Sequence, residues 1–121
     1  VFRRGLGRMV DALAPARVTA FAFVPEQRYD VPRALAMNAL YEHPAETALP
    51  LAVHEGRQAP LREAMADVAA RYPFRILDVG ARLCGPDGCP MRQGDLPLYA
   101  DDNHLSRGGT LALADFFHEA F

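Results

Sequence analysis

The sequence predicts an α/β fold, in which helices cover a mostly parallel sheet. Two observations predict this fold: an amphipathic helical pattern leads twice into a short apolar run, and no long hairpin pattern occurs. The chain has 121 residues, of which 50% are hydrophobic and 23% charged, a composition that argues against both disorder and a membrane span. We therefore expect residues 1–121 to form a single soluble domain.

The first helix-to-strand unit lies at the start of the chain. Over residues 3–13, apolar side chains recur at helical spacing and leave Arg3, Arg4 and Arg8 on the opposite face. These arginines could contact an acidic glycan or a lipid phosphate, but a solvated helix face explains them without a ligand. Residues 18–24 follow as an apolar run of branched and aromatic side chains, which predicts a strand buried on both faces.

The second unit follows a segment with a weaker pattern. Residues 32–41 open with proline and predict a short helix, and residues 41–60 predict a long connection interrupted by prolines. Apolar side chains then recur every three or four residues over 61–72, which predicts a helix that ends at Pro73. Residues 74–79 predict the second buried strand.

The end of the chain predicts one more amphipathic helix over residues 111–121, with Ser106 placed to cap it or its first turn. We expect Phe116 and Phe117 to belong to the core. Only two strands are predicted, and a parallel pair leaves both sheet edges unpaired. The missing strands would come from sequence before Val1 or from a second copy of the chain in a homodimer.

The charged residues indicate neither a nucleic-acid partner nor a metal site. All 13 basic residues are arginines, and 15 acidic residues give a net charge of -2, so the chain has no general attraction to a polyanion. His43, His54 and His118 occur in no metal-binding spacing such as His-Glu-x-x-His. We therefore expect surface or packing roles for these histidines, and no cofactor.

The two cysteines, Cys84 and Cys89, flank the turn sequence Gly-Pro-Asp-Gly, which can bring their side chains together. A local disulfide and a pair of free thiols in a reducing compartment both fit this spacing. Four intervening residues do not match the Cys-x-x-Cys redox motif.

The most informative segment is 99–110, with the sequence YADDNHLSRGGT. Asp101 precedes His104 by three residues in a loop that leads into a helix, so one turn can bring the carboxylate to Nδ1 of the imidazole. That contact leaves Nε2 free as a base, as in the acid and base of a hydrolase triad. The same spacing also occurs as ordinary turn and capping chemistry.

A family resemblance covers residues 83–116. The segments LCGPDGC and GDLPLYADDNHLSRGGTLALADF resemble the end of the SGNH (GDSL-like) hydrolase domain that is fused to membrane acyltransferases. The shared pattern is a cysteine pair, a tyrosine, Asp-x-x-His, and Leu-Ser with a glycine beyond. Upstream, VTAFAFVPEQRYDVPRALA is similar to the family's buried strand and Tyr-Asp-x-Pro segment. The resemblance implies a three-layer fold, of which this chain is the C-terminal part.

The resemblance also implies residue roles. Asp101 would be the triad acid, His104 the base, and Asp102 neighbouring scaffold. The family's nucleophile lies in an early Gly-Asp-Ser segment that does not occur here, nor do its oxyanion-hole glycine and asparagine blocks. We therefore expect Ser106, the single serine, to be a helix cap. The N-terminal, nucleophile-bearing portion is expected to be absent, and the chain alone to be inactive.

By the same resemblance, the complete protein would O-acylate a cell-envelope glycan, typically with an acetyl group, so its partners would be that glycan and an acyl donor. It would be periplasmic or otherwise extracytoplasmic, and attached to the inner membrane through a domain outside this chain. That setting favours a disulfide between Cys84 and Cys89. The alternative is a non-catalytic glycan-binding or interaction module with the same fold.

Overall fold

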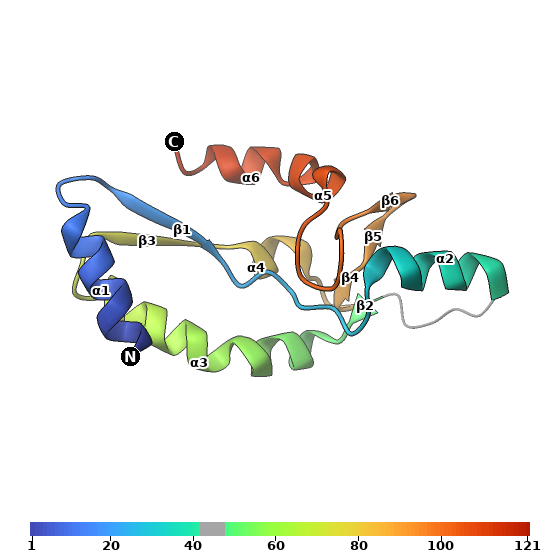
Figure 1. Ribbon diagram of the computed structural model, residues 1–121, viewed down its shortest axis with the longest axis horizontal. Helices are drawn as coiled ribbons and strands as arrows, with labels where there is room; N and C mark the ends of the chain where they lie inside the picture. The colour runs from blue at the N-terminus through green and yellow to red at the C-terminus, as the bar shows by residue number, and fades with distance from the viewer. Residues whose placement is uncertain (42–47) are drawn as a thin grey trace.

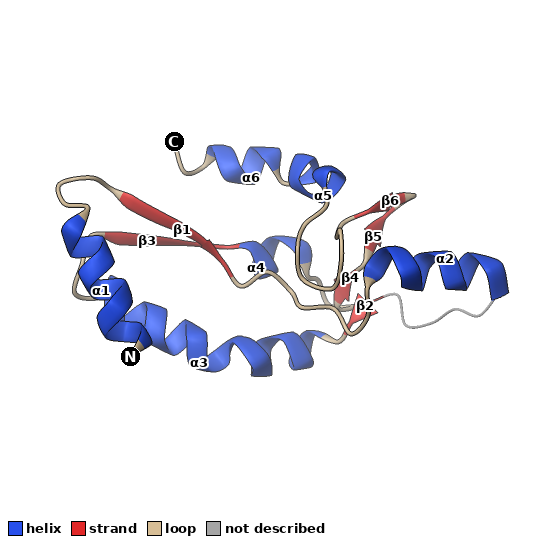
Figure 2. Cartoon of the chain, in the orientation of Figure 1, coloured by secondary structure: helices blue, strands red, loops and turns tan. Residues whose placement is uncertain are grey.

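A computed structural model describes residues 1–41 and 48–121 of the chain (Figures 1 and 2). Its elements are, in order, α1 (Phe2–Ala12), β1 (Val18–Ala22), α2 (Val31–Tyr41), β2 (Ala48–Leu49), α3 (Leu51–Ala69), β3 (Phe74–Asp78), α4 (Val79–Leu83), β4 (Cys89–Pro90), β5 (Arg92–Gln93), β6 (Leu96–Pro97), α5 (Arg107–Ala112) and α6 (Ala114–His118). Helices and small sheets alternate along the chain. The α/β fold class is confirmed.

The two predicted long strands form a parallel pair at the centre of three layers. β1 and β3 run side by side from the pairing of Val18 with Phe74 to that of Ala22 with Asp78. Figure 1 shows α1 and α3 on one side of this pair and α5 and α6 on the other. Two antiparallel pairs, β2 with β4 and β5 with β6, lie beyond its end. Within the described residues, β1 and β3 pair only with each other.

Both faces of the parallel pair are covered by apolar side chains. The cluster beneath α1 and α3 contains Val10, Phe23, Met65, Val68 and Phe74. The cluster beneath α5 and α6 contains Leu77, Val79, Leu113 and Phe116. Burial of each large side chain contributes roughly 1.5–3 kcal/mol, so these two clusters hold the layers together.

A third cluster lies at the end of the molecule that carries the short strands. Val31 at the start of α2 packs with Met91, Leu98 and Tyr99, all of them 2% exposed or less. These residues come from segments far apart in the sequence. Their contact fixes the start of α2 against the chain that precedes Asp101, the predicted triad acid.

The predicted connection over residues 41–60 was wrong beyond the six residues, 42–47, that the structure does not describe. The helix predicted to start at residue 61 starts at Leu51 and passes through Pro60. A proline inside a helix removes one backbone hydrogen bond, a cost that the packing of one helix face can offset. Here His54, Met65 and Val68 are buried on α3, on both sides of the proline.

Two smaller predictions also needed correction. β1 is half-buried rather than buried on both faces, and Phe21 is 40% exposed. The predicted last helix is divided at Leu113 into α5 and α6, and α5 already begins at Arg107. The predicted first helix is confirmed as α1, on which Met9 is 50% exposed.

The chain leaves β1 through a residue in the left-handed region. Phe23 has a φ of 63°, which is uncommon for a residue with a side chain. Its ring is buried, and the guanidinium of Arg62 lies 4.2 Å from the ring centroid. The sharp change of direction at Phe23 sends the chain toward the cluster around Tyr99.

Candidate catalytic site

The predicted triad residues lie at the tip of a loop that folds back on itself. Tyr99 and Leu105 form an isolated antiparallel bridge at the base of the loop. The backbone N–H of Ala100 donates to the carbonyl of His104 at 2.8 Å, and that of Ser106 donates to the carbonyl of Leu98 at 2.9 Å. These backbone bonds bring the two ends of the loop together, so the segment between them forms a tight turn.

Asp101 and His104 are in direct contact. Oδ2 of Asp101 lies 2.7 Å from Nδ1 of His104, and Oδ1 accepts the backbone N–H groups of His104 at 2.7 Å and Asn103 at 2.9 Å. An ionised carboxylate only accepts hydrogen bonds, so Nδ1 carries the proton and donates it. In the neutral imidazole, Nε2 is then an acceptor without a proton. This is the tautomer that a general base requires.

The same hydrogen bonds hold Asp101 in its charged form. The backbone N–H groups of His104 and Asn103, followed by the His104 side chain, lower the pKa of Asp101 to about 2. The carboxylate is therefore ionised throughout the pH range in which a histidine titrates. The imidazole is open to solvent, because the His104 side chain is 78% exposed and that of Asp101 is 41% exposed. A substrate or a second catalytic group can reach Nε2.

The single serine is engaged elsewhere. Ser106 is the N-cap of α5: its Oγ accepts the backbone N–H of Gly109 at 2.9 Å and donates to the carbonyl of Pro97 at 2.7 Å. Among the described residues, no hydrogen bond joins this hydroxyl to His104. Its part-buried position and its two partners fit a cap rather than a nucleophile.

The loop that carries Asp101 and His104 is supported by residues for which the sequence predicted no role. The backbone N–H of Gln27 donates to the carbonyl of Asp102 at 2.7 Å, and that of Val31 donates to the carbonyl of Asp101 at 3.2 Å. Gln27 is 3% exposed, and its Nε2 donates to the carbonyl of Cys89 at 3.1 Å. The signal available in the sequence was the Tyr-Asp-x-Pro segment, since Val31 lies within it and Gln27 lies two residues before it. Asp102 takes part through its backbone, as scaffold would.

Tyr99 is the largest fully buried side chain near the loop. Burial raises the pKa of its phenol, and the hydroxyl has no hydrogen-bond partner among the described residues. The hydroxyl therefore stays protonated at neutral pH. Because it sits beneath the loop rather than at its surface, Tyr99 supports the site and does not face a substrate.

A disulfide joins Cys84 and Cys89, and no described cysteine is free. Gly85 and Gly88 exchange two backbone hydrogen bonds inside the ring that it closes, at 2.9 and 3.0 Å. Cys89 is fully buried and pairs with Leu49 in the β2–β4 sheet. The crosslink therefore fixes the turn to the part of the molecule that also holds Gln27.

The other histidines have different surroundings. His43 lies outside the described residues, and His118 is exposed at the end of α6. His54 is 2% exposed, and neither of its ring nitrogens has a hydrogen-bond partner in the described part of the chain. No cluster of three or more His, Cys, Asp or Glu residues suited to a metal ion occurs among residues 1–41 and 48–121.

Comparison with known protein families gives a match over nearly the whole chain. The family model described as "SGNH domain (fused to AT3 domains)" matches residues 1–119. No curated protein and no solved structure matches the chain. The family match covers nearly the whole chain and includes both the parallel pair and the Asp101 loop.

Proposed function

The chain belongs to the SGNH domain family that is fused to AT3 domains, and from this membership we propose that it contributes the acid and the base of a Ser-His-Asp triad for acyl transfer. The family is of hydrolase or acyltransferase type. In this proposal the complete domain transfers an acyl group, typically acetyl, to a hydroxyl of a cell-envelope glycan. Asp101 is the acid and His104 the base.

One observation carries the assignment. The carboxylate of Asp101 accepts two backbone N–H groups on Oδ1, and its Oδ2 is left to accept Nδ1 of His104 at 2.7 Å. A capping aspartate needs only the first pair of bonds. The additional contact orients the imidazole, fixes its tautomer and leaves Nε2 at the surface, which is the arrangement that base catalysis uses.

The proposed reaction proceeds in two steps. Nε2 of His104 accepts the proton of a serine hydroxyl as its oxygen attacks the acyl carbonyl, and the protonated imidazole then gives that proton to the departing donor group. In the second step, His104 accepts the proton of a glycan hydroxyl that attacks the acyl-serine, and returns it to the serine oxygen. Asp101 remains ionised and stabilises the imidazolium in both steps.

The proposal places the nucleophilic serine outside this chain. Ser106 is the single serine, and its hydroxyl is held by Pro97 and Gly109. An extracytoplasmic setting is supported by the fusion to AT3 domains that the family description states and by the disulfide. Among the helices described here, none has both the length and the apolar character needed to cross a bilayer. Membrane attachment would use a domain outside the chain.

The test is made in cells that carry the substitution in the gene for the whole protein. Base-labile acetate on the purified envelope glycan is measured for the unchanged protein and for His104→Ala, Asp101→Asn and Asp102→Asn. We expect His104→Ala to remove the modification and Asp101→Asn to lower the transfer rate by roughly 10⁴-fold, as in other triads. Asp102→Asn is the matched control, because its carbonyl bond to Gln27 is retained.

The outcome also separates the proposal from a binding module of the same fold. If His104→Ala and Asp102→Asn leave the same amount of acetate on the glycan, with equal protein levels, the catalytic assignment is wrong. Retained glycan binding in that case would support the non-catalytic alternative.

A further inference from the structure

Two backbone hydrogen bonds join the loop of Asp101 and His104 to the segment between β1 and α2. The backbone N–H of Gln27 donates to the carbonyl of Asp102 at 2.7 Å, and that of Val31 donates to the carbonyl of Asp101 at 3.2 Å. Both acceptors belong to the turn that brings the Asp101 carboxylate to the imidazole. Whatever holds this segment in place therefore also holds the loop.

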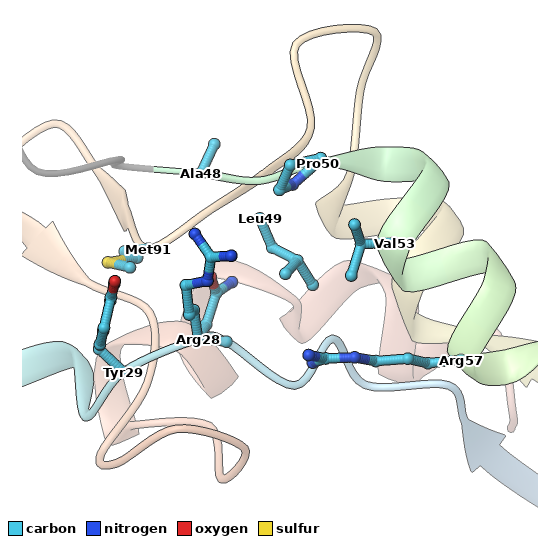
Figure 3. A pocket seen from close by; sticks show the side chains of 9 residues that line it. Arg28, Tyr29, Ala48, Leu49, Pro50, Val53, Arg57 and Met91 are labelled. Atoms are coloured by element: carbon cyan, nitrogen blue, oxygen red, sulfur yellow. The ribbon is translucent and has the colours of Figure 1, made fainter.

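Side chains from two directions hold the segment. It runs past the small pocket drawn in Figure 3, in which Arg57 extends toward it from α3. Nη1 of Arg57 donates to the carbonyl of Glu26 at 3.1 Å, in an exposed hydrogen bond. Nε2 of Gln27 donates to the carbonyl of Cys89 in β4, also at 3.1 Å, in a buried hydrogen bond. Water competes with the exposed bond and not with the buried one, so the Gln27 bond is the stronger restraint.

Gln27 is present for its hydrogen-bond donor. The residue is 3% exposed, and its Oε1 is buried without a hydrogen-bond partner among the described residues. A buried oxygen without a partner costs stability, so an apolar side chain of the same shape would suit the core at least as well. Only the glutamine supplies the directional bond from Nε2 to the Cys89 carbonyl.

The disulfide fixes the carbonyl that accepts this bond. Cys89 lies in β4, which pairs with β2 over only two residues, and so short a pair holds its position weakly by itself. The disulfide joins Cys89 to Cys84, the residue that ends α4, and α4 directly follows β3. The crosslink therefore ties the Cys89 carbonyl to the central parallel pair of strands.

We propose that Gln27 is a positioning residue for Asp101 and His104, and that the disulfide acts on this pair through the Gln27 side chain. The restraint runs from the disulfide to the Cys89 carbonyl and to Nε2 of Gln27, and from the backbone N–H of Gln27 to Asp102. Without the Nε2 bond, the loop shifts and Nδ1 of His104 is held by Asp101 for less of the time. The consequence for acyl transfer rests on the proposed function, whereas the consequence for the geometry does not.

The test measures the tautomer of His104 in the 121-residue chain. At pH about 8.5 an imidazole is neutral, and long-range ¹H–¹⁵N NMR then distinguishes the ring nitrogen that carries the proton from the one that does not. In the unchanged chain Nδ1 should carry it, because Oδ2 of Asp101 accepts that proton at 2.7 Å. Gln27→Met removes the donor and keeps the length of the side chain. The ¹⁵N shifts of the two nitrogens should then approach each other, because both tautomers become populated.

Val10→Ala is the matched control. It opens a cavity in the cluster beneath α1 and α3, so it lowers the stability of the chain at a site away from the loop. The two ¹⁵N shifts of His104 should stay as they are in the unchanged chain. Shifts that move equally in Val10→Ala and Gln27→Met would show a general effect of lost stability, and would overturn the inference.

A variant without the disulfide tests the coupling. Replacing both Cys84 and Cys89 by serine should move the ¹⁵N shifts of His104 in the same direction as Gln27→Met. The same replacement in the Gln27→Met chain should add little, because effects that act through one shared contact are not additive. Equal further changes in the two backgrounds would show that the disulfide does not act through Gln27.

Hydrogen exchange of the unchanged chain gives a test that does not require a folded variant. Nε2–H of Gln27 and the backbone N–H groups of Gln27, Val31 and Ala100 should show the same protection, because one opening exposes them all. Ala100 reports on the loop, since its N–H donates to the carbonyl of His104 at 2.8 Å. Weaker protection of the Gln27 side chain than of the three backbone groups would show that the loop stays closed without its bond, and would contradict the proposal.

The acetate assay on the whole protein separates this inference from the proposed function. At equal protein levels, Gln27→Met should lower the transfer rate by roughly ten- to a hundredfold, the scale of a misplacement of about 1 Å, and Val10→Ala should retain it. If His104→Ala removes the acetate and Gln27→Met does not lower the rate, the inference fails while the proposed function holds. If His104→Ala leaves the acetate in place, the proposed function fails, and the NMR measurements still decide whether Gln27 positions the pair.

Discussion

Asp101 is held in its charged form by three donors, and this predicts a pH dependence of stability. Its pKa is about 2 when folded and close to the ordinary 3.9 when unfolded, so the unfolded chain binds a proton first as the pH falls. The stabilisation by the carboxylate is therefore complete above pH about 4 and is lost as the pH falls toward 2. Asp101→Asn, which keeps an oxygen acceptor but not the charge, should lack this contribution.

The measurement compares the free energy of unfolding of the two proteins by urea denaturation from pH 6 to pH 2. The advantage of the unchanged chain over Asp101→Asn should shrink across the lower half of this range. Other carboxylates titrate equally in both proteins and cancel in the difference. A difference that stays constant from pH 6 to pH 2 would contradict the hydrogen-bonding pattern described for Asp101.

Contacts between residues that are close in the sequence could be predicted, whereas contacts between residues far apart in the sequence could not. The contact of Asp101 with His104 follows from a spacing of three residues in one turn, and the capping position of Ser106 follows from the residue type. The support from Gln27 and Val31 depends on contacts across about 75 residues of chain, for which a single sequence carries no periodic signal. The catalytic roles of Asp101 and His104 stay predictions.

Among the elements, α5 packs unusually close to the chain before the loop of Asp101 and His104. A Cβ added to Gly109 would overlap the carbonyl of Leu98, which accepts the backbone N–H of Ser106. Backbone cannot move aside without opening that hydrogen bond. We expect Gly109→Ala to destabilise the chain by about 1–3 kcal/mol, the usual cost of overpacking, as measured by urea denaturation.

Gly108→Ala is the control for this prediction. Its added Cβ would meet the side chain of Leu96, which is 42% exposed and free to turn away, so the loss should be smaller. Both changes place alanine at neighbouring positions of the same helix, so helix propensity affects them alike. Equal stabilities of the two variants would show that Leu98 yields, and that the close approach does not hold the loop in place.

The helix α3 shows why an element can be missed in a sequence. Pro60 weakens a helix locally, and the prolines were the reason to predict a connection before residue 61. The helix nevertheless runs from Leu51, because its buried face gains more from packing than the proline costs. The packing energy of α3 depends on contacts with the rest of the molecule, and the helix propensities of its residues carry no information about those contacts. In contrast, β3 lies within one residue of its predicted end, since a short apolar run after Pro73 has few alternatives.

Over the whole molecule, the layer order could be predicted and the closure of the sheet could not. Two helix-to-strand units require a parallel pair covered by helices, and this is the arrangement of α3, β1 and β3. Within the described residues, β1 and β3 pair only with each other. The hydrophobic pattern of the sequence does not indicate which strand would pair with their outer edges. A second copy of the chain as the neighbour stays a prediction.

His54 lies where α3, α4 and the end of β1 meet, and this predicts how the whole fold responds to acid. Its Nε2 is packed against Gly80, whose neighbour on the other side is the carbonyl of Phe23. Burial lowers the pKa of His54, and Arg62 lowers it further, against the opposing charges of Asp78 and Glu55. The folded chain therefore keeps this imidazole neutral at a pH where the unfolded chain protonates it.

As the pH falls below about 6.5, the ordinary pKa of histidine, the unfolded chain binds a proton that the folded chain refuses, so the free energy of unfolding decreases. His54→Gln should flatten this decrease between pH 6.5 and 5. If His54→Gln proves too unstable to compare, the imidazole C–H signals of the unchanged chain give the same information. The His54 signal should titrate below pH 6.5, the ordinary value for histidine, and a titration at or above that pH would contradict the prediction.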